Sequence, residues 1–128
     1  MVKRILGVAL AGALALTVAG AVPAIAKDGD VIERGSCSGS ADWKLKLSPE
    51  GGGIEVEYEV DSNVVGQSWR VKIFQNGDRI FAGTRQTKGA SGSFEVRVVA
   101  DDTAGTDTFR GKAVNAATGE TCKGTASF

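Results

Sequence analysis

Few side chains in this chain are suited to acid–base or nucleophilic chemistry. Its 128 residues include no histidine, which excludes Ser–His and Cys–His nucleophile pairs and histidine metal sites. The densest carboxylate cluster is Glu55, Glu57 and Glu59, and a carboxylate pair could hydrolyse a glycoside if it faced a cleft. These residues alternate with apolar ones near Lys44 and Lys46, as expected for a solvated strand face. We therefore predict no catalytic residue and no enzyme activity.

Loop oxygens offer a second chemistry, the binding of calcium. Asp101, Asp102, Asp107 and Asn115 fall in predicted loops or turns. Calcium takes about 6–8 oxygen ligands in a defined loop geometry, and the sequence has neither an EF-hand loop nor an Asp-Gly repeat. Acidic residues are common in turns because their side chains cap the backbone. We predict no metal site and no cofactor.

Residues 1–26 have the pattern of a secretory signal peptide. Lys3 and Arg4 precede an apolar stretch over 5–22, and Ala-Ile-Ala at 24–26 forms a small-residue cleavage site. A retained membrane anchor is the alternative, because roughly 20 apolar residues can span a bilayer. The stretch is rich in Ala and Gly, is interrupted by Pro23 and is followed by no basic anchor. We expect cleavage and a secreted, extracellular protein with no stable membrane insertion afterwards.

Cys37 and Cys122 are the two cysteines of the chain. In an exported protein an even number of cysteines indicates disulfide bonding, and two cysteines allow one pairing. A redox or metal-binding pair is the alternative, but there is no C-x-x-C motif. We predict a Cys37–Cys122 disulfide that joins the two ends of a domain over 36–128, preceded by a flexible segment over 27–35. In the chain-entropy model, such a loop closure stabilises by on the order of 4–5 kcal/mol.

The charge balance gives no reason to expect nucleic acid or an anionic membrane as a partner. The chain has 15 basic and 15 acidic residues, and cleavage after residue 26 removes Lys3 and Arg4 but no acidic residue, so the remaining net charge is −2. A weakly acidic domain has no overall electrostatic reason to bind nucleic acid or an anionic membrane. The roughly 100 residues that remain suit one domain with one core.

Apolar and polar residues alternate with period two along most of the chain after residue 40. This alternation predicts about seven strands, near 41–47, 54–60, 69–73, 79–84, 94–98, 109–113 and 122–128. Gly, Asn, Asp and Ser clusters separate them, and no segment beyond the signal has a helical period. Such a pattern is typical of an antiparallel immunoglobulin-like or fibronectin-like sandwich, with a small closed barrel as the alternative.

The turn over 48–53 joins the first two of these strands. We expect Leu47 to lie opposite Ile54, in a register that sets Lys46 opposite Glu55 on the solvated face. Opposite charges that face each other across strands contribute about 0.2–1 kcal/mol. They would support this register.

Asn76-Gly77 is the strongest hairpin signal, because both central positions of a type I′ turn need positive φ. A simple two-residue turn directs Ile80 inward and Phe81 outward, whereas one bulged residue reverses them, and the sequence leaves both alternatives open. In the first alternative an exposed aromatic and basic patch forms, of the kind enriched in interfaces. We predict this patch as the candidate binding surface, with the members Arg70, Lys72, Phe74, Arg79 and Phe81.

The larger aromatic residues suggest a further alternative. Trp43, Tyr58 and Trp69 fall on the predicted inner faces of their strands, so we expect them in the core. A row of exposed rings that stacks on sugars would instead indicate a carbohydrate-binding module.

Several segments carry a resemblance to small exported proteins of actinobacteria. They are Ser36-Cys37-Ser38-Gly39, Trp43-Lys44-Leu45-Lys46, the stretch from Ile54 to Asn63, Gly66-Gln67-Ser68-Trp69, Asn76-Gly77, the stretch from Ser91 to Arg97, and Gly119-Glu120-Thr121-Cys122. The segments extend over most of the chain after the signal. The resemblance implies export and an immunoglobulin-like sandwich, and it implies no activity or site.

These observations lead to one functional prediction with two alternatives. We predict a secreted, non-catalytic binding module that contacts a protein or glycan of the cell envelope or the extracellular space. A carbohydrate-binding module is the first alternative. A small protease inhibitor is the second, although its reactive loop would have to lie in 48–53 or 87–92, which are glycine-rich and poorly preorganised.

Overall fold

The computed structural model describes residues 29–128; the predicted signal peptide, 1–26, lies outside them. The described chain contains eight strands and no helix. The strands are β1 (Val31–Ser36), β2 (Asp42–Glu50), β3 (Gly53–Asp61), β4 (Ser68–Gln75), β5 (Asp78–Gln86), β6 (Ser93–Asp101), β7 (Thr108–Asn115) and β8 (Thr121–Ser127). Strands β2 to β8 cover the seven predicted segments, and the predicted all-β class is confirmed.

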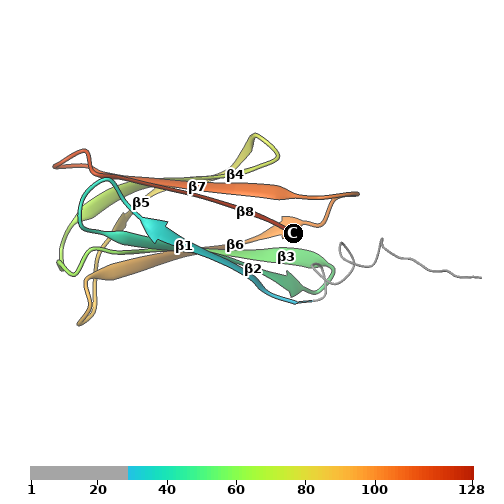
Figure 1. Cartoon of the computed structure of the whole chain (residues 1–128), viewed down its shortest axis with the longest axis horizontal. Coiled ribbons are helices and arrows are strands. Elements are labelled where there is room, and N and C mark those ends of the chain that lie inside the picture. The colour runs from blue at the N-terminus through green and yellow to red at the C-terminus, as the bar shows by residue number, and fades with distance from the viewer. Residues whose placement is uncertain (1–28) are drawn as a thin grey trace, which may run out of the picture.

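The strands form two sheets that face each other (Figure 1). The first sheet has the order β1-β2-β3-β6 and the second sheet has the order β5-β4-β7-β8, with all neighbours antiparallel. The chain crosses between the sheets after β3, after β5 and after β6. Each strand therefore buries one side against the opposite sheet and exposes the other.

The core lies between the sheets and consists of the inward-facing residue of each alternating pair. Its large members are at most 1% exposed, and they are Leu45, Leu47, Ile54, Val56, Tyr58, Val60, Trp69, Val71, Ile73, Val96 and Phe109. Full burial of such a side chain stabilises the fold by about 1.5–3 kcal/mol. A strand with one buried and one solvated face alternates apolar and polar residues. The period-two pattern of the sequence therefore predicted the buried faces of β2, β3, β4, β6 and β7.

Strand β1 was not expected. The segment 27–35 was predicted to be flexible, but Val31–Ser36 pairs with β2 along its whole length, from Val31 opposite Leu47 to Ser36 opposite Asp42. The strand lies at the edge of the first sheet, and four of its six residues are exposed. Its residues do not alternate in polarity because an edge strand that is little covered by the opposite sheet needs no apolar face.

The β2–β3 hairpin is tighter than expected. Leu47 lies opposite Val56, two residues further along β3 than predicted. The strands continue to Glu50 and Gly53, and the turn consists of Gly51 and Gly52 alone, with φ of 53° and 86°. Such positive φ values suit glycine in a two-residue hairpin turn. Because the displacement is an even number of residues, the predicted inner and outer faces are unchanged.

The β4–β5 hairpin adopts the bulged alternative. Asn76 and Gly77 form a two-residue turn with φ of 51° and 89°. The register then shifts, so that Phe74 lies opposite Arg79 but Ile73 lies opposite Phe81. Ile80 is the extra residue, and both Ile80 and Phe81 pack against the core.

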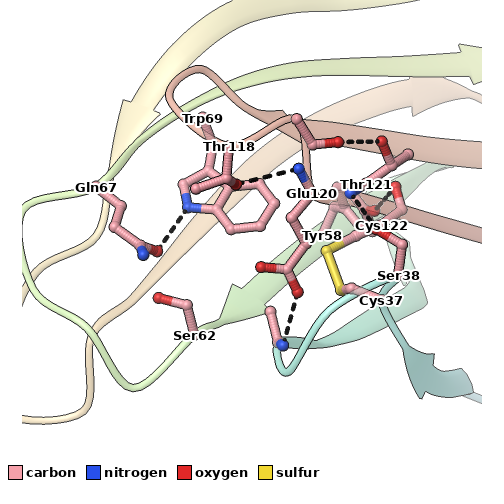
Figure 2. The surroundings of a disulfide bond; sticks show 12 residues. Cys37, Ser38, Tyr58, Ser62, Gln67, Trp69, Thr118, Glu120, Thr121 and Cys122 are labelled. Carbon is pink, nitrogen blue, oxygen red and sulfur yellow. Dashed lines mark hydrogen bonds between the residues drawn. A yellow bond between two sulfur atoms is a disulfide. The ribbon is translucent and has the colours of Figure 1, made fainter.

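The predicted Cys37–Cys122 disulfide is present (Figure 2). Cys37 follows β1 of the first sheet, and Cys122 lies in β8 at an edge of the second. Two hydrogen bonds run beside it: Ser38 N donates to Thr121 O at 2.8 Å, and Thr121 N donates to Ser38 Oγ at 2.9 Å. The bond therefore fastens the two sheets together along one side of the sandwich.

Trp43 closes the same side of the sandwich. Its indole lies against Gly35 of β1 and Gly124 of β8, and a Cβ at Gly35 would lie only 2.7 Å from Trp43 Cζ2. A Cβ at Gly124 would come closer still to the ring. Both strands approach the indole this closely because their glycines have no side chain. Nearby, the buried Tyr58 hydroxyl donates to the carbonyl of Cys122 at 3.0 Å, and burial raises the pKa of that hydroxyl.

Asp107 directly precedes β7 and anchors the N-terminal end of this strand. Its side chain is fully buried and accepts hydrogen bonds from Thr103, Gln75 and Asn76. Its backbone exchanges two hydrogen bonds with Phe128, which holds the end of β8 in place. Burial by itself opposes ionisation, but the hydrogen bonds outweigh it and lower the pKa of the Asp107 carboxyl below its usual value.

The lowered pKa of Asp107 predicts a specific loss of stability in acid. A group whose pKa is lower in the folded state contributes stability that is present above its ordinary pKa of 3.8 and is lost as the pH falls through the folded value. Urea unfolding at a series of pH values from about 7 to about 2 should therefore show a steeper acid loss for the wild type than for Asp107→Asn. The variant should also be less stable at neutral pH. Equal acid slopes would contradict this role of Asp107.

Candidate binding surface

The structure divides the predicted candidate surface between two sides of the second sheet. Arg70, Lys72 and Phe74 alternate with the buried residues of β4 and point outward, and Arg79 lies opposite Phe74. Phe81, in contrast, lies opposite the buried Ile73 and packs against the core. The bulge at Ile80 is the reason, since it reverses the faces of the strand beyond it. The predicted pair of exposed phenylalanines is therefore not formed.

Both phenylalanines stack against arginines. The guanidinium of Arg110 in β7 lies 4.4 Å from the centre of the Phe74 ring, and that of Arg85 lies 5.0 Å from the Phe81 ring. A cation over an aromatic face contributes about 0.5–1 kcal/mol at an exposed site. Arg110 thus covers one face of the Phe74 ring, which is otherwise half-buried.

A row of lysines crosses the outer side of the second sheet. Lys72 of β4 lies directly opposite Lys112 of β7, and Lys112 lies directly opposite Lys123 of β8. Residues opposite each other in neighbouring strands share a face, with Cβ atoms about 4.5–5.5 Å apart. Three ammonium groups from three distant parts of the sequence are thereby brought together.

Arginines flank this row on both sides. Arg70 lies one pair further along β4, opposite Thr84 and Val114, and Arg110 and Arg79 both lie opposite Phe74. We name the outward-facing set Arg70, Lys72, Arg79, Arg110, Lys112 and Lys123 the basic face. Asp78 is the one acidic residue in the four strands of the second sheet. It lies opposite Gln75 at the turn end of the β4–β5 hairpin, next to the outward pair Phe74–Arg79 and not in line with it.

The basic face has no internal charge compensation. Within residues 29–128, the ion pairs join Lys44 to Glu59, Lys46 to Asp30, and Arg97 to Glu55 and Glu57, all away from this face. Like charges that lie directly opposite each other across strands are destabilising. The lysine row thus costs folding stability.

Two depressions hollow the basic face on either side of Lys112 and Val114. One, of about 290 Å³, is lined by Arg70 and Lys72 together with those two residues. The other, of about 520 Å³, is lined by the same two residues together with Ser36, Cys37, Ser38, Thr121 and Lys123. The loop after β1 forms a wall of the larger depression because the disulfide and the Ser38–Thr121 hydrogen bonds hold it there.

The outer side of the first sheet carries charges of both signs, which pair with each other. It carries the carboxylate cluster of the sequence, and Glu55 and Glu57 both pair with Arg97 of β6. A hydrogen bond with Glu55, together with partial burial, raises the pKa of Glu57. The nearby depression of about 420 Å³ is lined by other residues, namely Arg34, Gly35, Asp42, Trp43, Lys44, Glu59 and Asp61. The Glu55–Glu57 pair thus lies on a sheet surface beside an arginine that contacts both carboxylates.

The aromatic residues do not form a platform for sugars. Tyr58 and Trp69 have no exposed surface, and Trp43 is half buried at the edge of the core. Trp69 also donates from Nε1 to Gln67 at 3.2 Å, which satisfies its polar atom within the protein. Tyr58 and Trp69 match the expected core placement, whereas Trp43 packs against the core and also lines a depression at the surface.

Neither loop predicted for the protease-inhibitor alternative is long. Within 48–53 only Gly51 and Gly52 lie outside the strands, and 87–92 is closed by a bridge between Lys88 and Ser93. The exposed, well-held loop is instead 62–67, which presents Val64 and Val65 at 49% and 62% exposure. The buried Thr87 holds it by hydrogen bonds to Val64, Gly66 and Gln67.

Two further findings concern residues 29–128 only. They contain no group of three His, Cys, Asp or Glu side chains placed to hold a metal ion. They also contain no helix long and apolar enough to cross a membrane.

The opposite orientations of Phe74 and Phe81 predict different effects of the same substitution. Phe81→Ser removes a ring that packs against the core and should lower the free energy of unfolding by about 1–3 kcal/mol. Phe74→Ser removes a surface ring and its contact with Arg110 and should cost about 1 kcal/mol or less. Urea unfolding of both variants measures the difference. A larger loss for Phe74→Ser would contradict the bulged register.

The lysine row predicts a substitution that stabilises the protein. Lys112→Gln should raise the free energy of unfolding by about 0.2–1 kcal/mol at low ionic strength, because it removes the central charge of the row. The gain should shrink as salt screens the repulsion. Lys46→Gln is the matched control: it removes a lysine that lies opposite Glu57 and 3.7 Å from Asp30, so it should not stabilise. Destabilisation by Lys112→Gln at low salt would contradict the repulsive row.

Comparison with known proteins gives no assignment. No protein-family model, no curated protein and no solved structure matches the chain. A function must therefore be proposed from the side chains of the chain itself, among which the basic face is the most distinctive arrangement.

Proposed function

We propose that this chain is an exported, non-catalytic binding module of immunoglobulin-like or fibronectin-like fold that acts at or outside the cell envelope, with the basic face as its ligand-binding surface. The observation that carries the proposal is the row of Lys72, Lys112 and Lys123 together with its flanking arginines. A surface that is costly to the fold and free of acidic side chains favours an anionic partner.

The arrangement of the strands supports the fold part of the proposal. The two sheets have separate edges, β1 and β6 in one and β5 and β8 in the other. A closed barrel would join such edges by hydrogen bonds. Two open antiparallel sheets with repeated crossings between them are the arrangement expected of immunoglobulin-like sandwiches.

Three features support the location part. The first is the signal-peptide pattern of residues 1–26, and the second is the resemblance to small exported actinobacterial proteins. The third is the Cys37–Cys122 disulfide, since such bonds persist in oxidising compartments. Together they favour cleavage after Ala26 and a partner outside the cytoplasm.

The test combines export with binding. Expression of the full chain in a secreting host should release an oxidised product that begins at Lys27, as intact mass and N-terminal sequencing would show. That product should bind an isolated cell-envelope fraction, and binding should weaken with rising salt because surface charges carry it.

Three sets of variants locate the binding surface. Combined Lys72→Gln, Lys112→Gln and Lys123→Gln should abolish most of the retention on the envelope fraction. Combined Arg34→Gln, Lys44→Gln and Lys46→Gln remove the same number of charges from the first sheet and should retain it. Combined Val64→Ser and Val65→Ser test the exposed loop. Loss of binding in the loop variant alone would assign the surface to 62–67 and overturn the proposal.

A further inference from the structure

We infer that the ligand of the basic face is a linear anionic polysaccharide, which lies across strands β4, β7 and β8 along the row Lys72–Lys112–Lys123. This inference rests on the proposed function and names the ligand class of the same surface. Five observations carry it: the spacing of the charges, the residue type in the row, the lining of the larger depression, the placement of the exposed apolar side chains, and the position of Arg110 over Phe74.

The spacing of the charges favours a chain over a compact anion. Neighbouring strands lie about 4.8 Å apart, so the three lysines span about 10 Å across the sheet. Arg70 and Arg110 lie two residues along their strands from Lys72 and Lys112, on opposite sides of the row, at about 7 Å. A single phosphate or carboxylate can touch only part of this array, because the charges do not converge on one point. A polymer with repeated anionic groups can contact the whole row.

The residue type in the row also suits a polymer. Each lysine carries a compact charge on a flexible stem, whereas arginine offers a rigid fork suited to one planar anion. Three adjacent lysines can therefore follow carboxylate or sulfate groups whose spacing varies along a chain. The arginines then lie on either side of the polymer axis.

The lining of the larger depression favours sugars. Beside Lys112 and Lys123 it is lined by Ser36, Ser38 and Thr121, three residues with hydroxyl side chains. Ser38 Oγ accepts from Thr121 N, and Thr121 Oγ1 donates to Gly119 O. Since a hydroxyl has one donor and two acceptor lone pairs, these groups still have capacity to bind sugar hydroxyls. A depression with both ammonium and hydroxyl groups matches an acidic sugar unit.

The rest of the surface disfavours the other classes of polyanion. Membrane binding of a basic surface is strengthened by apolar side chains inserted beside the charges, but the large exposed ones among residues 29–128, Ile32, Val64, Val65 and Val99, lie in the first sheet or in the 62–67 loop. Single-stranded nucleic acid is bound by aromatic rings on which bases stack, and Arg110 covers Phe74. Protein interfaces are depleted of lysine at their centre, where this face has three.

The test uses the oxidised domain beginning at Lys27, with calorimetry or surface binding at low and at physiological salt. The acidic probe is linear polygalacturonate with its defined oligomers, and the neutral probe is its fully methyl-esterified form. Affinity should rise with oligomer length until the chain spans the lysine row, and the neutral form should not bind. Anionic phosphatidylglycerol vesicles and single-stranded DNA test the two other polyanion classes and should bind at least about tenfold more weakly.

Variants of matched charge make the test specific to the row. Combined Lys72→Gln, Lys112→Gln and Lys123→Gln should weaken polygalacturonate binding about tenfold or more. Combined Arg34→Gln, Lys44→Gln and Lys46→Gln, which remove the same number of charges from the first sheet, should change it less than about twofold. Melting curves establish that each variant is folded, and Lys112→Gln alone should lose affinity while it melts higher.

Several outcomes would overturn the inference. Equal losses in the row variant and the first-sheet variant would show that net charge alone is sensed. Vesicle or DNA binding as tight as polygalacturonate binding would assign the face to that polyanion or to polyanions in general. Retention on the envelope fraction that depends on the lysine row, without polygalacturonate binding, would reject the ligand class while leaving the proposed function intact.

Discussion

The packing of two apolar faces against each other is the constraint on which the rest of this structure depends. Each strand turns every second side chain into the space between the sheets, and that space is filled by residues such as Tyr58, Trp69 and Phe109. Because successive side chains of a strand point to opposite faces of the sheet, the side chains between the buried ones must point outward. The exterior of the protein is thus a direct consequence of how its interior is filled.

The outward positions are not occupied at random. The first sheet carries carboxylates interleaved with basic residues, and Arg97 bridges two of them. The second sheet carries the basic face without a single acidic outward residue. A chain with equal numbers of acidic and basic residues therefore has a strongly basic side, because β4, β7 and β8 contribute their charges to one surface. Net charge describes the sum and says nothing of this separation.

Stability and binding make opposite demands on that surface. Lys72, Lys112 and Lys123 repel one another in every folded molecule, at a cost of a few tenths of a kcal/mol or more for each adjacent pair. The disulfide offsets such costs, since closing a loop between residues 85 apart contributes on the order of 4–5 kcal/mol in the chain-entropy model. The same bond holds Ser36 and Ser38 at the edge of the basic face. It thereby links the stability of the sandwich to the shape of its candidate site.

The sequence by itself determined the all-β class, the inward and outward sides of six of the seven predicted strands and the Cys37–Cys122 pairing. Each of these follows from local alternation or from the number of cysteines. It did not determine β1, whose residues lack alternation, or the bulge at Ile80, since one extra residue costs little and its effect depends on how Phe81 fits the core. Arg110, Lys112 and Lys123 occupy outward positions of the period-two alternation, but which strands become neighbours is decided by the packing of the whole chain. Only the tertiary structure could align three lysines from separate strands, because the register between distant segments is set by their shared core.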